Sequence, residues 1–442
     1  METVRKNNRG AGGAQDDDDR RGGAADAGNG DRHTGGWQLL LLALLRGLAG
    51  PGLFSSLGVF FPLIAAEGGG SLGTLSLSVS LASVAGACFL PLAGRLYERF
   101  DFRRVTFFGV LLMTLPYALY AVSPAPLWRA FLSVPLGCGM VMLVNLMVPC
   151  YLRLLGADTG SSLGVLVALS GLAGAAFQPG LAVTLHAHGW RTAYWTFGLL
   201  SLAVMAGALF LLPPVRLSGG NGSIARRGDT EDTPMQGRRS EEASAVAGTP
   251  GEHTSAGLFW SMFLFQGVIT GFSMFHQHFS TFAAASALAH STMTLALTLS
   301  MLASALGAFA LGWLTRRFGS GITGVGTLAL GAVSVLLFGF MGRSAVGFLT
   351  AAAIHGAVSG AIGVTVPAAA REVYPQGRYA RSLSHIMVSS PLFTLLFMQV
   401  YGVSYDRTGD FGAALLCLLA VLVGAAAVWS RSFVKRREKR RA

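Results

Sequence analysis

The stretch Gly94-Arg-Leu-Tyr-Glu-Arg-Phe-Asp-Phe-Arg-Arg104 is a short basic loop between two long apolar segments, residues 72–93 and 105–123. A second stretch of similar character, Gly312-Trp-Leu-Thr-Arg-Arg-Phe-Gly319, follows the apolar segment 291–314. Each loop comes after the second apolar segment of its half of the chain. The same loop at the same place in both halves indicates an internal duplication.

Apolar segments of about 20 residues recur along the whole chain, and each is long enough to cross a hydrocarbon core of about 30 Å. Hydrophobic residues make up 52% of the chain and charged residues 12%, whereas a soluble domain carries about 25% charged residues. Because lipid offers no hydrogen bonds to the backbone, the segments must be helices. The sequence therefore predicts an all-α membrane protein with twelve transmembrane helices in two six-helix bundles. The segments cover residues 38–65, 72–93, 105–123, 126–150, 160–184, 191–212, 257–284, 291–314, 321–341, 344–368, 380–404 and 411–431.

Two polar regions divide the chain. Residues 213–256 begin with two prolines and contain almost no large apolar residue, which is typical of a flexible linker. The first 36 residues are rich in Gly, Asp and Arg, which is typical of disorder. The predicted organisation is a disordered cytoplasmic tail (1–36), an N-terminal bundle (37–212), a cytoplasmic linker (213–256), a C-terminal bundle (257–431) and a basic cytoplasmic tail (432–442).

The cationic residues are distributed by side of the membrane. With the N-terminus inside, 28 of the 33 Lys and Arg fall in cytoplasmic segments and only Arg129, Arg191, Arg343 and Arg407 in outer loops. This asymmetry follows the positive-inside rule and predicts that both termini are cytoplasmic. It also explains the net charge of +12 without nucleic-acid binding, which we do not expect.

The first basic loop is similar to the signature Gly-x-Leu-x-Asp-Arg-x-Gly-Arg-Arg of the major facilitator superfamily of transporters. The matching residues are Gly94, Leu96, Arg99, Arg103 and Arg104, while Glu98 stands for the Asp and Asp101 for the second Gly. The resemblance implies two six-helix halves that rock about a central site, with this loop as a cytoplasmic gate. In the second copy of the loop, Thr315 stands where the acid would be, so that copy is expected to make a weaker latch.

Shorter motifs resemble the monocarboxylate-porter and oxalate/formate-antiporter branch of that superfamily. They are Leu57-Gly-Val-Phe-Phe-Pro62, Gly189-Trp-Arg-Thr-Ala193, His278-Phe279 and Tyr405-Asp-Arg-Thr-Gly409. The resemblance implies a small organic anion as substrate, moved with a proton or by exchange. The charged substrate residues of that branch are not carried over: Ser55 stands at its first-span Lys, the eighth span has no charge before Arg316, and the eleventh offers only His385.

Arg46 is the only charged residue in the interior of a predicted span, since none of the 21 Asp and Glu lies in one. An arginine near the membrane centre costs at least about 2.5–3.5 kcal/mol and usually faces a wet cavity. Arg46 is therefore predicted to attract an anionic substrate. The alternative is that its side chain extends to the cytoplasmic headgroups.

Histidine can carry a proton near neutral pH where no carboxylate is available. The candidates for proton coupling are His278, which could also bind substrate, and His276 and His385. Further candidates for substrate binding are the neutral polar residues of the spans, although bonding between helices is the commoner use of such side chains. These are Asn145, Gln178, Gln266 and Gln399.

We therefore predict a secondary transporter that imports a small organic anion with a proton. The alternatives are an exporter of amphipathic metabolites or drugs, and a receptor with a transporter fold. The chain has no P-loop or other enzyme motif, and its four cysteines form no CxxC pair, so neither an enzyme nor a metal or cofactor is predicted. A monomer in a bacterial inner membrane is expected.

Overall fold

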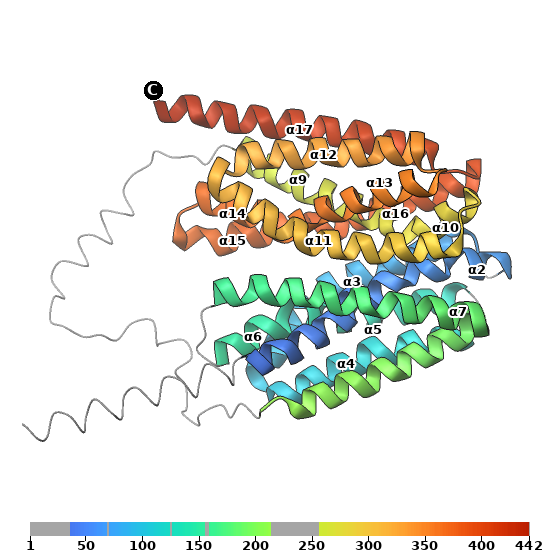
Figure 1. Cartoon of the computed structure of the whole chain (residues 1–442). Coiled ribbons are helices and arrows are strands. Elements are labelled where there is room, and N and C mark those ends of the chain that lie inside the picture. The colour runs from blue at the N-terminus through green and yellow to red at the C-terminus, as the bar shows by residue number, and fades with distance from the viewer. Residues whose placement is uncertain (1–35, 69, 124–125, 155–158, 214–255, 442) are drawn as a thin grey trace, which may run out of the picture.

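The computed structural model describes residues 36–68, 70–123, 126–154, 159–213 and 256–441. Nearly all of these residues are helical, and no strand occurs among them. The predicted N-terminal tail and linker lie outside the described residues, except at their edges. The helices are grouped in two bundles, an N-terminal one of α2 to α7 and a C-terminal one of α9 to α17 (Figure 1).

The N-terminal bundle begins with a helical span, Gly36–Ala66, whose winding changes along its length. It is an α-helix to Gly47, then a π-helix, then a 3-10 helix, then α2. The elements of this bundle are η1 (Leu48–Phe54), η2 (Leu57–Phe60), α2 (Phe61–Ala66), α3 (Leu72–Arg99), α4 (Phe102–Leu119), η3 (Tyr120–Val122), α5 (Pro126–Met140), η4 (Val141–Leu146), α6 (Met147–Leu154) and α7 (Thr159–Leu211).

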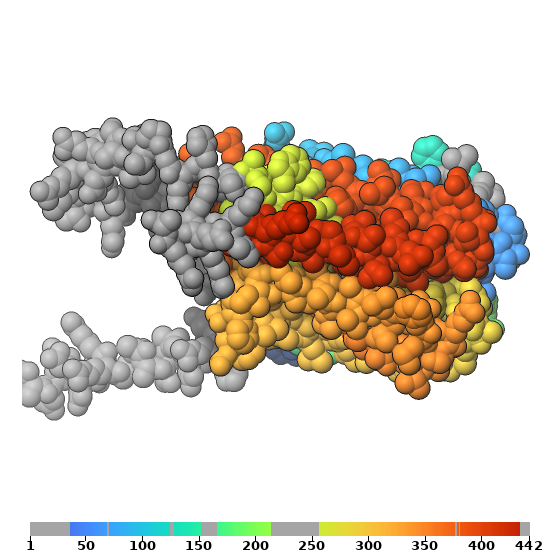
Figure 2. Space-filling view, turned by 90° about the horizontal axis from the view of Figure 1, so that it is seen from above, coloured from blue at the N-terminus to red at the C-terminus, as the bar shows by residue number. Residues whose placement is uncertain are grey.

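The C-terminal bundle has the same order of long helices and also contains short 3-10 segments. Its elements are α9 (Ala256–Ser273), η5 (Met274–His278), α10 (Phe279–Ala285), α11 (His290–Phe318), α12 (Ser320–Met341), α13 (Ala345–Ser359), η6 (Gly360–Gly363), α14 (Thr365–Val373), α15 (Gln376–Met387), α16 (Ser389–Thr408) and α17 (Gly412–Arg441). Helix α17 packs along α12 on the outside of this bundle (Figure 2).

Helix α7 contains two membrane crossings. Eleven helices of the described residues are long and apolar enough to span a membrane, and one of them runs over 46 residues, Leu166–Leu211. At 1.5 Å per residue this is about 69 Å, twice what one crossing needs. Gly189 has φ +80° and ψ 173°, a conformation open essentially to glycine alone, and α7 reverses there (Figure 1). The predicted twelve crossings are present, but a single residue turns the chain where a six-residue loop was expected.

The signature loop is short because a side chain caps the helix that follows it. Helix α3 ends at Arg99, and the Asp101 carboxylate accepts hydrogen bonds from the backbone N–H groups of Arg103 and Arg104 at the start of α4. Aspartate is a favoured residue at this position because the first N–H groups of a helix have no partner inside it. Asp101, which replaces a glycine of the signature, thus begins α4.

The two bundles meet along two long seams, α3 against α16 and α7 against α11, and also where η2 and α2 meet η5 and α10. We call the end of the molecule where α9 begins and α17 ends the terminal end, and the opposite end, where α2 and α10 lie, the loop end (Figure 1). Large apolar side chains such as Phe340 and Val346 are exposed on the outer surface. Such a surface is stable against acyl chains and unstable against water.

Candidate substrate and coupling site

Arg46 is held by a backbone carbonyl of another helix. Its side chain is half-buried, and its Nε donates to the carbonyl of Val144 at 3.2 Å. Val144 lies in the π-helical segment η4, and π-helical turns are frequent at functional sites. No ion pair between Arg46 and a carboxylate is found within the described residues, so no carboxylate of this part of the chain neutralises Arg46. A half-buried cation of this kind favours an anionic ligand.

Asn145 follows Val144 in η4 and is exposed. The amide of Asn145 and the guanidinium of Arg46 therefore belong to one region of the N-terminal bundle. Gln178 is buried and donates from Nε2 to the carbonyl of Pro51 in η1 at 3.3 Å. Arg46 thus ties the first span to η4, and Gln178 ties α7 to η1 of the first span.

Gln266 and Gln399 lie in the C-terminal bundle. Gln266 is buried, and its Nε2 donates to Ser390 Oγ at 3.1 Å, while Thr270 lies at 3.1 Å from the same hydroxyl. These three side chains join α9 to α16. Gln399 is half-buried on α16, and its Nε2 has no hydrogen-bond partner among the described residues.

His278 is completely buried at the contact between the bundles. Its ring centroid lies 5.4 Å from that of Tyr401 and 5.6 Å from that of Phe411, both of its own bundle. It lies 6.0 Å from that of Phe61, which belongs to the N-terminal bundle. Neither ring nitrogen has a hydrogen-bond partner within the described part of the chain. An imidazole in such surroundings is strongly disfavoured in its charged form.

The other candidate histidines lie in different surroundings. His276 is half-buried, with Nδ1 2.6 Å from the carbonyl oxygen of Ser273. His385 is exposed on α15. The structure brings His276 and His278 into the same short 3-10 segment, η5, and leaves His385 in another element.

Gln277, between the two histidines, joins the bundles. Its Oε1 accepts from the backbone N–H of Gly58 at 2.8 Å, and its Nε2 donates to the carbonyl of Phe54 at 3.0 Å. Ser280 Oγ donates to the carbonyl of Gly58 at 2.6 Å. Gly58 has no room for a side chain, since a Cβ there would lie 1.7 Å from the carbonyl oxygen of Gln277.

Asp406 makes the second contact between the bundles. Its Oδ1 accepts from the backbone N–H of Leu72 at 2.8 Å and its Oδ2 from that of Gly73 at 2.9 Å. A carboxylate at a helix N-terminus is stabilised by both the free N–H groups and the helix dipole. All hydrogen bonds found between the two bundles within the described residues involve Gln277, Ser280 or Asp406. The molecule is therefore latched at its loop end.

The sequence did not predict these latch residues as functional. Asp406 lies in the motif Tyr405–Gly409, and Gly58 lies in the motif that closes the first predicted span, so both could have been singled out from the motifs. Gln277 lies between two candidate histidines, but nothing in the sequence indicates its partner 219 positions away.

The gate residues of the signature loop lie at the terminal end. Arg103 donates from Nη2 to the carbonyl of Phe210 at 3.2 Å and to that of Leu212, both at the end of α7 in its own bundle. Gly94 is half-buried, while Glu98, Arg99 and Arg104 are exposed. Among the described residues, none of these side chains forms a hydrogen bond or ion pair with the C-terminal bundle.

An ion pair beside the turn of α7 fastens the loop end of the N-terminal bundle, and its carboxylate, Glu67, lies just after the first span. Arg191 Nη1 donates to Glu67 Oε2 at 2.7 Å, and its guanidinium lies 4.2 Å from the centroid of the Trp190 ring. Trp190 and Arg191 together hold the pKa of the Glu67 carboxyl below its ordinary value. The contribution of this pair to stability is present above the ordinary carboxyl pKa and is lost as the pH falls through the lowered pKa.

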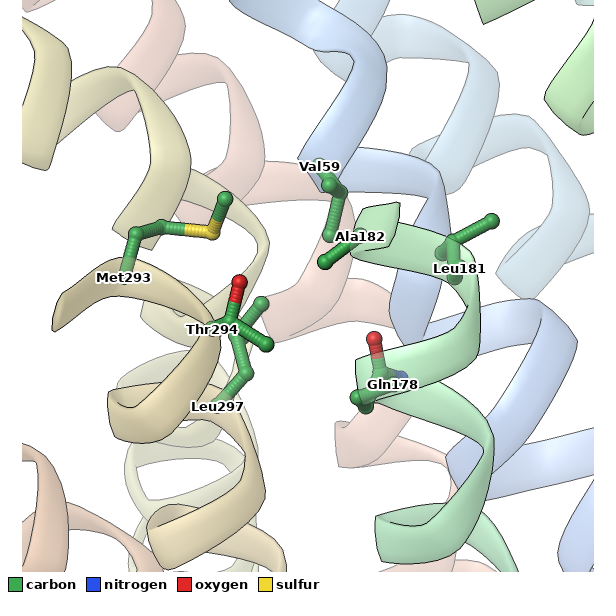
Figure 3. Close-up of a pocket in the computed structure, with 7 residues that line it drawn as sticks. All are labelled: Val59, Gln178, Leu181, Ala182, Met293, Thr294 and Leu297. Carbon is green, nitrogen blue, oxygen red and sulfur yellow. The ribbon is translucent and has the colours of Figure 1, made fainter. Parts of the chain in front are cut away.

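A narrow gap lies between the bundles near the loop end. Figure 3 shows Gln178 and Ala182 of α7 facing Met293, Thr294 and Leu297 of α11, with Val59 above them. The gap leaves no room for a water molecule. A larger groove of about 760 Å³ adjoins it and shares Ala182 and Thr294 with it.

Comparison with known proteins gives a family and a fold. The family model described as Major Facilitator Superfamily matches residues 42–382. The chain is similar to a mutant form of the nucleoside transporter NupG, with TM-score 0.70 and 13% identity over 90% of this chain and 99% of that one. It is also similar to a bacterial homolog of the human lysosomal transporter Spinster in an inward-facing, unoccupied conformation, with TM-score 0.61 and 15% identity over 90% and 98%. No curated protein matches the chain.

Proposed function

Since the chain belongs to the Major Facilitator Superfamily of membrane transporters, we propose that it imports a small organic anion of the monocarboxylate kind together with a proton. The observation that carries the proposal is Arg46, a half-buried guanidinium with a single carbonyl partner, Val144, and no carboxylate beside it in the described chain. A substrate carboxylate would supply the missing charge. Asn145, exposed in η4 next to Val144, is the candidate for a further hydrogen bond to the substrate.

The polar contacts at the two ends of the molecule support the assignment of this structure to one state of the transport cycle. The loop end is latched by Gln277, Ser280 and Asp406, whereas the gate residues at the terminal end make no polar contact with the other bundle in the described part of the chain. The positive-inside distribution supports a cytoplasmic terminal end. In this orientation, the protein would be closed to the outside, and a substrate would reach Arg46 from the cytoplasm.

His278 is suited to couple the proton to this movement. Phe61 covers it from the opposite bundle, so opening of the loop end would withdraw that ring and expose the imidazole to the outer medium. His278 would take up a proton there and lose it when the bundles close, because burial disfavours the charged ring. His276, half-buried in the same segment, is the second histidine that could carry the proton.

The finer features of the proposal follow from the sequence. The motifs at Leu57–Pro62 and Tyr405–Gly409 favour the monocarboxylate-porter branch, and the arginine-rich cationic residues favour a bacterial inner membrane. Neither bundle needs a second copy to complete Arg46 or His278, which supports a monomer. An exporter of amphipathic compounds is the competing function, and the groove between α7 and α11 is the feature that favours it.

The test is uptake of labelled monocarboxylates into proteoliposomes, with and without an inward proton gradient. We expect gradient-stimulated uptake of at least one acid and a loss of about 10- to 100-fold in Arg46→Gln, the cost of one hydrogen bond to a charged group. Arg46→Lys should keep part of the activity. Arg343→Gln, which removes an exposed loop arginine, is the matched control. No uptake of any acid, or equal uptake by Arg46→Gln, would exclude an anion site at Arg46.

A further inference from the structure

The groove of about 760 Å³ between α7 and α11 opens on the outer surface of the protein, where the two bundles meet. Its lining includes Val183 and Leu295, which are 69% and 52% exposed. Side chains with this exposure lie against acyl chains in a membrane-spanning region. The groove therefore faces the bilayer.

The side chains of the groove that can still donate a hydrogen bond to a ligand lie at one end. The hydroxyls of Thr294 and Thr298 donate to carbonyls of their own helix, those of His290 and Thr294, at 3.2 and 3.0 Å. These hydroxyls have no hydrogen left to donate to a ligand. His186 and His290 remain, one from each bundle, with ring centroids 3.6 Å apart, together with the hydroxyl of Ser291 next to His290. Nε2 of His290 is buried and has no partner among the described residues.

We propose that this groove binds a long-chain carboxylate from the bilayer, with the carboxylate at the His186–His290 pair and the chain along Val183 and Leu295. No acidic residue lines the groove, and imidazole N–H groups are donors that suit a carboxylate. The volume lies in the range of pockets that bind drug-sized ligands, which fits a single long-chain acid.

A ligand in the groove would affect the transport cycle without entering the central site. The gap behind the groove, at Gln178 and Val59, leaves no room even for a water molecule, so the groove is closed toward the interior. Because α7 and α11 belong to different bundles, a ligand that touches both stabilises their present arrangement relative to one in which they separate. This inference concerns a different surface from Arg46 and does not depend on the transported substrate.

The experiment uses the full chain in phosphatidylcholine nanodiscs with a photoreactive diazirine analogue of palmitate, followed by peptide mapping. Adducts should concentrate on residues 179–187 and 290–298. Leu295→Trp, which fills the groove, should lower labelling at these residues about tenfold or more. Leu306→Trp is the matched control, since Leu306 is 71% exposed on the same helix but outside the groove. Even labelling along α11, or labelling unaffected by Leu295→Trp, would mean surface lipid only and would overturn the proposal.

The head group is tested separately. Unlabelled palmitate should compete with the probe, and hexadecane should not. Replacement of both histidines, His186→Ala with His290→Ala, should weaken competition by palmitate about tenfold, as expected for the loss of a hydrogen bond to a carboxylate. Equal competition by hexadecane, or full competition in the double variant, would contradict a carboxylate site at the histidine pair. Thermal unfolding of each variant in the same nanodiscs separates these outcomes from loss of the fold.

Discussion

At Gly58, a single missing side chain allows the loop end to close. A Cβ at this position would meet the carbonyl oxygen of Gln277 at 1.7 Å, and a backbone atom cannot move away as a side-chain tip can. Gly58→Ala should therefore prevent the hydrogen bonds to Gln277 and Ser280 from forming together. We expect uptake to fall at least about tenfold, because the closed state becomes less stable by more than about 1.4 kcal/mol.

The control for this change is Gly339→Ala on α12, where an added Cβ would meet nothing within 4 Å. Initial rates of uptake into proteoliposomes, normalised to the amount of folded protein, give the comparison. Wild-type rates in Gly58→Ala would show that the contact is not needed for transport.

His278 makes a prediction about coupling that is distinct from binding. If its imidazole carries the proton, His278→Gln should abolish uptake driven by a proton gradient and leave exchange of substrate across the membrane in place. During exchange, the transporter carries its load on both the inward and the outward step, so no net release of the proton is needed. Parallel assays of gradient-driven uptake and of exchange measure the difference.

The exposed His385 is the comparison, because it is also a candidate for proton coupling and lies in another element, α15. Loss of both activities in His278→Gln would indicate a binding or structural role for His278. Loss of gradient-driven uptake in His385→Gln alone would move the coupling to α15.

Residue type and membrane position were enough to single out Arg46 and His278 from the sequence, since charged and titratable groups are rare inside spans. Their surroundings were not predictable. Whether His278 faces water or Phe61 depends on the other bundle, and the partner of Arg46 is a backbone carbonyl that carries no sequence signal. Asn145, Gln178, Gln266 and Gln399 share a residue class but differ in exposure, which only the packing of the helices decides.

At the scale of elements, one carboxylate links the C-terminal end of α16 to the N-terminal end of α3, which packs beside it. Asp406 bonds two N–H groups in the first turn of α3. Asp406→Asn keeps one acceptor and removes the charge and the second acceptor, so about 1–2 kcal/mol of the contact should be lost. The population closed at the loop end should fall about 5- to 30-fold relative to the open one. Distances between spin labels placed on the loop ends of the two bundles report this shift.

Asp410→Asn is the control, because Asp410 accepts from the N–H of Gly412 within its own loop and does not touch the other bundle. An unchanged distance distribution in Asp406→Asn would mean that Gln277 and Ser280 hold the loop end by themselves. The same distribution in both variants would mean that the effect is one of surface charge.

The apolar segments of the sequence were enough to predict the transmembrane helices. The places where the structure differs from that prediction have local causes. The predicted loop between residues 184 and 191 is absent because Gly189 turns the chain alone. The π-helical segments η1 and η4 were not predicted, because their carbonyls are satisfied from other helices, by Gln178 and Arg46. Such contacts between helices leave no recognisable pattern in the sequence of either helix.

At the scale of the whole molecule, the duplication in the sequence predicted two bundles but could not predict which end is closed. The polar contacts between the bundles join residues that are far apart in the sequence, and no motif indicates these pairs. In the structure these contacts are at the loop end, with Gly58, Gln277 and Asp406. The orientation in the membrane and the state of the cycle can therefore be tested together.

Asn145 provides that test, because it is exposed in η4 beside the partner of Arg46. With the four native cysteines replaced, Asn145→Cys should react with a membrane-impermeant maleimide added from the cytoplasmic side in inside-out vesicles. It should react at least about tenfold more slowly from the outer side, because the latched loop end blocks that route. Adding Gly58→Ala should raise the outer rate and lower the cytoplasmic one, since a destabilised latch shifts the two-state equilibrium. Faster labelling from the outer side in the Asn145→Cys protein would contradict either the proposed orientation or the closed loop end, and a protease-accessible tag after Arg441 would decide between them.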